Sequence, residues 1–362
     1  MSRARRRDRR VYLASHPVLL ALLAVTRRLP VLRIGRTVLV NRAAEFHEAL
    51  TRLPLDRLAA GTTGAVAREL VSDGLLFDQD GPEHRGARRS INLGATGVEQ
   101  VRPAWQSVLD RCVESLAQGA EVDIVDVARE LAGATVVAIL GVDSDPLRVA
   151  EAAQDVAAAS LKHHLTGRRR IRRGRGTWQE AEAATARLND LVKGERPEAL
   201  AAVLAVTAVN TTVAGLPRAV AWCADAKMWS DVVDDERCEI LVDELVRAVV
   251  AVPLLVRVAQ ADGAVGNCPV RKGDRLLLVA RHAADASRVD PDCVRPAPPH
   301  VRQLVFGAGP HACPGARLAR AQLTDTLRAL AAYQPVVVRA LADRRAALPS
   351  WRSLVVRARG PH

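Results

Sequence analysis

The chain has few aromatic residues, no cysteine cluster and no apolar run near its N-terminus that is long enough to cross a membrane. Aromatic residues make up 3% of the 362 residues. Its six cysteines are scattered without the CxxC or Cys/His spacing of a zinc site, as is typical of free thiols in a reducing compartment. The uninterrupted apolar run Pro17–Thr26 has ten residues, too few to span a bilayer. These absences argue against a disulfide-stapled secreted domain and a zinc site.

Hydrophobic residues make up 49% of the chain and charged residues 25%, which excludes a disordered or collagen-like protein. Ala, Leu and Arg are frequent, so helix formers outnumber strand formers and the composition predicts a mainly α fold. Lys and Arg outnumber Asp and Glu by 52 to 40, a formal net charge of +12. Without repeats or a linker, we expect one domain over residues 1–362.

The N-terminus is basic and then apolar, a pattern that partly mimics a signal peptide. A second Arg pair follows the apolar run, and no clear cleavage site is present. We therefore interpret residues 1–15 as a solvated basic tail, followed by a surface helix. We expect a cytoplasmic protein with no membrane partner and no membrane-spanning segment.

The pattern of apolar residues predicts a hairpin, several amphipathic helices and one buried helix. Two short β-branched runs, Val31–Ile34 and Thr37–Val40, flank Gly35-Arg36 and predict the hairpin. Residues 197–226 are too apolar for a surface helix, so they predict a central one. Helices are also expected at 43–50, at 98–141 with a break near 118–121, and at 147–162, 235–250 and 316–332. Strands are expected at 254–259 and 275–279.

Residues 167–176 are rich in arginine. This segment fits either a patch that binds nucleic acid or an acidic membrane, or a solvated loop between two helices. Because no interleaved aromatic residue is available for base stacking, the solvated loop is favoured. We expect no nucleic-acid partner.

The most specific motif is residues 306–315, FGAGPHACPG, which end where a helix begins. A cysteine at a helix N-terminus experiences the positive end of the helix dipole and nearby backbone N–H donors. Both favour a thiolate at Cys313, and a rigid loop around it suits a metal ligand. The structural alternative is a buried cysteine in a tight turn.

This segment resembles the heme-binding loop of the cytochrome P-450 family, bacterial type, FxxGxxxCxG. Phe306, Gly309, Cys313 and Gly315 occupy its fixed positions. The resemblance implies heme b as cofactor, with Cys313 as the axial thiolate ligand of its iron. It also implies the family's fold, a helical prism with a smaller β-rich side.

Other residues match family positions in the expected order. Glu244 and Arg247 form the family's ExxR motif, a structural pair on one helix face. By resemblance, His84, Arg88 and Arg257 contact the heme propionates, and His311 occupies a further such position. Each of these residues alone could be a solvated charge, but together they would form a cationic cradle for two carboxylates.

The central helix departs from the family pattern. Thr211 retains the hydroxyl that the family places beside the oxygen site, but Asn210 replaces the usual acid. An amide cannot relay a proton as a carboxylate does. Asn210 is therefore either a marker of unusual chemistry or a tolerated variant. Pro217 should kink this helix just past Thr211.

Two other departures concern supporting structure. Cys293-Val294 stand where the family often has Arg-Phe, and Arg295 is a candidate substitute. The chain is also shorter than most members, and the missing length falls between residues 140 and 200, the family's substrate lid.

The resemblance implies a heme-thiolate monooxygenase, which inserts one oxygen atom from O2 into a small or medium apolar substrate in natural-product biosynthesis. Electrons would come from NAD(P)H through a ferredoxin and ferredoxin reductase. Two alternatives remain open. One is a peroxygenase, oxidative coupling or rearrangement enzyme, and the other is a catalytically silent member that acts as a partner protein.

Overall fold

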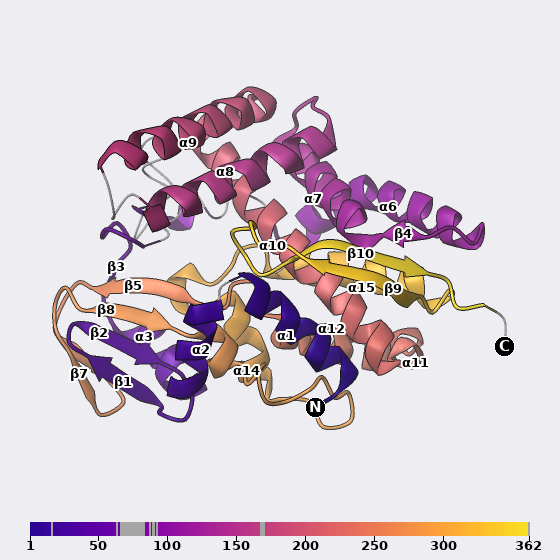
Figure 1. The fold of residues 1–362 in the computed structure, drawn as a ribbon. Helices are drawn as coiled ribbons and strands as arrows, with labels where there is room; N and C mark the ends of the chain where they lie inside the picture. The colour runs from indigo at the N-terminus through magenta and orange to yellow at the C-terminus, as the bar shows by residue number, and fades with distance from the viewer. Residues whose placement is uncertain are drawn as a thin grey trace.

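The computed structural model describes residues 1–15, 17–62, 64–65, 84–86, 88, 91, 93–166 and 171–360. Within these, the fold is mainly helical with smaller sheets, as predicted (Figure 1). The helices are α1 (Arg3–Ser15), α2 (Pro17–Thr26), α3 (Ala43–Arg52), α6 (Ala95–Ala117), α7 (Ile124–Leu140), α8 (Pro146–Thr166), α9 (Ile171–Val192), α10 (Glu198–Ala226), α11 (Trp229–Val233), α12 (Asp235–Val249), α13 (Ala280–Ala283), α14 (Pro299–Gln303) and α15 (Ala316–Ala331).

A five-stranded sheet forms the core of the β-rich side, in the order β1-β2-β8-β5-β3. The predicted hairpin is confirmed, because β1 and β2 pair antiparallel around Gly35, whose φ of 58° favours glycine. The strands are β1 (Val31–Ile34), β2 (Thr37–Val40), β3 (Leu55–Asp56), β4 (Val122–Asp123), β5 (Leu255–Ala259), β6 (Gly263–Val265), β7 (Cys268–Val270), β8 (Arg275–Leu278), β9 (Val336–Ala342) and β10 (Trp351–Arg357).

Helix α10 is the central helix of the fold and packs against α7, α8, α9, α1 and α12. Its length and composition would suffice to cross a membrane, which the sequence analysis did not anticipate. However, 50% of its most apolar window is buried inside the protein, as expected of a core helix. The helix continues past Pro217 to Ala226, and the kink at this position stays a prediction.

The prediction of a solvated tail at residues 1–15 was wrong, because Arg3–Ser15 form helix α1 packed on α10 (Figure 1). Ala4, Asp8, Val11 and Tyr12 are buried at helical spacing, whereas the intervening arginines mask this stripe in the sequence. Asp8 forms a buried ion pair with Arg218 of α10 at 2.7 Å. The N-terminal segment is therefore an integral part of the core.

The prediction of an arginine-rich loop was also wrong for residues 171–176, which belong to α9. Arginine is a good helix former, so its charge does not prevent a helix. Residues 167–170 lie outside the described residues. After α9, only residues 193–197 precede α10.

The two larger hydrophobic clusters of the described residues form a helical core and a β-side core. Leu304 belongs to the β-side core, and Leu318 of α15 belongs to the helical core. Residues 306–315 connect these two positions. The cysteine loop, residues 306–315, is thus held at its start by the β-side core and at its end by the helical core.

Candidate functional site

Backbone hydrogen bonds and two glycines shape the loop that carries Cys313. The Cys313 N–H donates to the Phe306 carbonyl at 2.7 Å, and Gly307 N–H donates to Leu304 at 2.9 Å. Gly307 and Gly309 have φ values of 76° and 70°, a region that disfavours residues with a Cβ. A Cβ at Gly309 would also lie 3.0 Å from the Leu50 carbonyl oxygen of α3. The sequence therefore forms a closed, rigid turn.

The Cys313 side chain is exposed by surface area, yet protein atoms surround it closely enough for desolvation to raise its pKa. A side chain that lies in a recess is both accessible to solvent and partly desolvated by the surrounding protein. The Gly315 N–H and the charges of Arg88 and Arg320 partly offset this rise in pKa. For the loop residues by themselves, desolvation thus outweighs the backbone N–H donor that the sequence analysis expected to favour the thiolate. A bound metal ion would supply the missing stabilisation of the anion.

Cationic and imidazole groups gather around this loop. The His84 and His311 rings lie 4.1 Å apart between centroids, with an angle of 31° between their planes. Burial lowers the pKa of Arg88, and the nearby Cys313 charge counteracts that effect. Three of the residues predicted for the cradle thus lie around the cysteine loop, although His84 and Arg88 are more than 200 residues distant in sequence.

Arg257, the fourth residue predicted for the cradle, is a cation without a carboxylate partner in the described part of the chain. Its Nη1 donates to the Val256 carbonyl at 2.8 Å, while its buried Nε has no hydrogen-bond partner. Desolvation lowers the pKa of its guanidinium. Because a buried polar atom without a partner is costly, this half-buried arginine is suited to bind an anionic group.

Asn210 and Thr211 on α10 are engaged within the helical core. The Asn210 Nδ2 donates to the Ala153 carbonyl of α8 at 3.1 Å and to the Val206 carbonyl at 2.8 Å. Thr211 Oγ1 donates to the Thr207 carbonyl at 2.7 Å. Among the described residues, no hydrogen bond joins either side chain to the cysteine loop.

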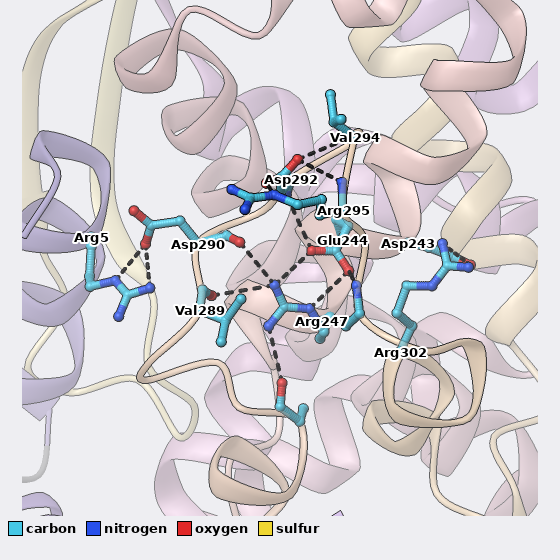
Figure 2. Close-up of polar contacts among 12 residues, drawn as sticks. Arg5, Asp243, Glu244, Arg247, Val289, Asp290, Asp292, Val294, Arg295 and Arg302 are labelled. Atoms are coloured by element: carbon cyan, nitrogen blue, oxygen red, sulfur yellow. Dashed lines mark hydrogen bonds and ion pairs between the residues drawn. The ribbon is translucent and has the colours of Figure 1, made fainter.

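The Glu244–Arg247 ion pair lies among several polar contacts (Figure 2). Both side chains are fully buried, at 0% exposure. Arg247 Nη2 and Nε donate to the two carboxylate oxygens of Glu244 at 2.7 and 3.1 Å. The arginine also donates to three backbone carbonyls, those of Ala284, Val289 and Asp290. This pair therefore fixes the segment after α13 against α12, instead of forming a surface ion pair.

Arg295 does not replace the family's arginine near this pair. Its side chain is 87% exposed and contacts Asp292 at 3.5 Å. Backbone donors take over instead, because the N–H groups of Asp292 and Ala297 bond the Glu244 oxygens at 3.3 and 3.0 Å. Backbone N–H groups of the 292–297 segment therefore supply the hydrogen bonds to the Glu244 carboxylate that a side chain would otherwise supply (Figure 2).

The sequence analysis missed two arginines that support the site. The Arg320 guanidinium lies 4.6 Å from the Phe306 ring centroid and bonds Asp243 of α12 at 2.6 Å. Arg5 of α1 bonds Asp290 at 2.5 Å, next to the carbonyl that Arg247 holds (Figure 2). Both contacts join residues distant in sequence, so no local pattern indicated them.

No protein-family model matches the chain, but individual known proteins are similar to it. The chain is 28% identical to nocardicin C N-oxygenase of Nocardia uniformis subsp. tsuyamanensis over 81% of its length and 80% of the relative. It is 26% identical to cytochrome P450-SOY of Streptomyces griseus, over 77% and 71%. A cytochrome P450 structure from Thermus thermophilus superimposes with a TM-score of 0.74 at 19% identity, over 96% of both chains. These findings support a bacterial cytochrome P450.

Cytochromes P450 are oxidoreductases of the monooxygenase type that carry heme b, and this chain fits that cofactor. A recessed cysteine suits an iron ligand, and half-buried Arg257, which pairs with no carboxylate among the described residues, suits a propionate. The paired histidine rings and Arg88 add further donors to the same cluster of side chains.

Proposed function

We propose that this cytochrome P450 is a heme-thiolate monooxygenase of natural-product biosynthesis, which inserts one oxygen atom from O2 into a small or medium apolar substrate. The observation that carries this proposal is the juxtaposition of recessed Cys313 with Arg88, Arg320 and the His84–His311 pair. In this proposal Cys313 holds the iron, while His84, Arg88, Arg257 and His311 hold the propionates. When bound, heme b supplies the reductive activation of dioxygen.

The chain's own residues would hold and orient the groups around that cofactor. Phe306, Gly309 and Gly315 keep the cysteine sulfur in place, with the Gly315 N–H directed toward it. The Glu244–Arg247 pair fixes the loop on which this arrangement rests. On α10, Thr211 Oγ1 is the hydroxyl proposed to hold a proton beside the reacting substrate, since Asn210 Nδ2 is already engaged with α8.

Several relatives support a role in natural-product biosynthesis. One curated relative is named nocardicin C N-oxygenase. Solved structures of the same fold include an EryK mutant in complex with erythromycin B, at 20% identity and a TM-score of 0.69. These names support the natural-product role, whereas the apolar substrate class rests on partly exposed apolar residues of α10 such as Val206.

We place the protein in the cytoplasm and propose a ferredoxin with its reductase as electron donor. The net charge of +12 would attract an acidic ferredoxin. Because salt screens such attraction, the electron-transfer rate should fall as ionic strength rises. A rate independent of salt would count against electrostatic docking.

Replacement of Cys313 tests the proposed function. In Cys313→Ser, the thiolate-type absorption band of the reduced carbon monoxide adduct should disappear together with monooxygenase turnover. Cys268→Ser is the matched control, because Cys268 is a free thiol on β7 and its loss should leave the band unchanged. An unchanged band in Cys313→Ser would refute the ligand assignment.

The engagement of Asn210 with α8 favours a second candidate, a peroxide-dependent or oxidative coupling enzyme. Without a carboxylate at this position, α10 offers no proton relay of the usual kind. Turnover with hydrogen peroxide alone, compared with ferredoxin and NADPH, separates the two candidates. Purified protein without stoichiometric heme would instead indicate a catalytically silent partner protein.

A further inference from the structure

Helix α2 presents an almost entirely apolar surface to the outside. Val18 and Val25 are 82% and 81% exposed, and Leu22 is 53% exposed. The outward residues of this helix are Pro17, Val18, Leu19, Ala21, Leu22, Ala24 and Val25. None of their side chains can form a hydrogen bond. Exposed apolar surface of this extent marks an interaction site.

The helix is held firmly in this position. Leu23, its buried apolar residue, packs with Leu39 of β2 and Val279. The buried Asn41 side chain donates to the carbonyls of Thr26 and Leu29, at 3.3 and 3.0 Å, and so fixes the turn after the helix. The apolar surface is therefore displayed by an ordered element and does not result from a frayed terminus.

Unpaired cations directly follow this apolar surface. Arg27 and Arg28 are exposed, and neither forms an ion pair with another described residue. By contrast, Arg5 and Arg7 of α1 pair with Asp290 and Asp225. The guanidinium groups after α2 are thus available to an external anion.

We propose that α2, together with Arg27 and Arg28, binds the surface of an anionic lipid bilayer. The apolar side of the helix would lie at the level of the acyl chains, and the two guanidinium groups would contact lipid phosphates. At about 1.5 Å per residue, this helix is too short to cross the membrane and lies in its plane. This inference is independent of the proposed reaction and replaces the expectation of no membrane partner.

The chemistry of the surface distinguishes a bilayer from a protein. Protein interfaces contain roughly one hydrogen bond per 100–200 Å² and are enriched in aromatic residues, but the outward side of α2 offers neither donors nor aromatic rings. Hydrocarbon requires neither. A second copy of this chain packed on the same surface would bring its own Arg27 and Arg28 toward the first pair, whereas anionic lipid complements them.

Cosedimentation of the full-length holoprotein with vesicles tests the proposal. The protein should bind vesicles of phosphatidylcholine mixed with phosphatidylglycerol, and should bind pure phosphatidylcholine more weakly. Val18→Asp/Val25→Asp should reduce binding by about tenfold or more. Val233→Asp/Val294→Asp is the matched control, because these valines are 75% and 77% exposed elsewhere and should leave binding unchanged.

Two further measurements make the test independent of a single variant. Arg27→Gln/Arg28→Gln should weaken binding to anionic vesicles by roughly tenfold or more and reduce its salt dependence. In the unmodified protein, vesicles should slow amide hydrogen exchange in α2. Retained heme absorbance in each variant confirms the fold.

Three results would overturn the proposal. The first is no binding to anionic vesicles, and the second is equal loss in the control variant. The third is concentration-dependent dimerisation that Val18→Asp/Val25→Asp abolishes, without any vesicle binding, because it would assign the surface to a second copy of the chain. Absence of monooxygenase turnover together with intact vesicle binding would contradict the proposed reaction and leave the membrane proposal supported.

Discussion

The side-chain amide of Asn210 joins two helices of the core. Its Nδ2 donates to carbonyls of α8 and α10, a role that requires a donor. A carboxylate would place negative charge beside two carbonyl oxygens. The amide thus matches its surroundings better than the acid usual in the family, which gives a physical reason for this departure.

Asn210→Asp should therefore destabilise the protein by about 2 kcal/mol or more at neutral pH, because both donors are lost and an anion is left unpaired. Asn210→Ala, which removes the donors without adding charge, should cost less. Thermal melts at neutral and acidic pH measure the loss of stability in each variant. The loss in Asn210→Asp should shrink at acidic pH, where the aspartate is protonated. Equal stability of the aspartate and alanine variants at neutral pH would contradict the assigned role.

His282 provides a prediction of pH dependence. Its Nδ1 lies 2.7 Å from Asn41 Oδ1, and because an amide oxygen only accepts, Nδ1 carries the hydrogen. Burial, followed by the charges of Arg281 and Arg27, lowers its pKa from 6.5 to about 4. The folded state therefore keeps this imidazole neutral under conditions where the unfolded chain binds a proton.

Between pH 6.5 and about 4, the unfolded state binds more protons, so the free energy of unfolding should fall as the pH is lowered. His282→Gln removes this contribution and should flatten the pH dependence over that window. Urea denaturation at a series of pH values measures the slope. Parallel profiles for the two proteins would show that His282 does not titrate as described.

At the scale of elements, one sequence pattern occurs in two different environments. Glu244–Arg247 and Glu99–Arg102 are both ExxR pairs within a helix. The first pair is fully buried, whereas the Glu99 side chain is 63% exposed. The same i,i+3 spacing thus produces a buried ion pair in α12 and a surface ion pair in α6.

Glu244→Ala should destabilise the protein by about 3–5 kcal/mol, because it leaves the Arg247 charge buried without its carboxylate. Glu99→Ala is the matched control and should cause no measurable loss, since solvent screens that pair. Chemical denaturation of the holoproteins measures both. Comparable losses in the two variants would mean that burial does not decide the strength of these pairs.

Local pattern explains which elements could be predicted. The hairpin around Gly35 and the apolar helix α10 follow from residues adjacent in sequence, and so does the loop that carries Cys313. Helix α1 was missed because its arginines obscure the spacing of Asp8 and Tyr12. Arg5 could not be assigned, because its partner Asp290 lies 285 residues away and long-range pairing leaves no local signal.

At the scale of the whole molecule, the candidate site lies where the two hydrophobic cores are connected. Arg257 extends from β5 on the β-rich side, while α10 belongs to the helical core. The assigned roles of these residues stay predictions. If heme b binds between the two cores, it should couple their unfolding.

Calorimetry of the holoprotein and of heme-depleted protein tests this coupling. The holoprotein should unfold in one transition, and the depleted protein at lower temperature in two, because its cores lose their shared ligand. Arg257→Met should lower the holoprotein Tm by several degrees but leave the depleted protein as stable or more so, since the variant removes a half-buried cation whose buried Nε has no hydrogen-bond partner. The same shift in both forms would show that Arg257 supports the fold without contacting the cofactor.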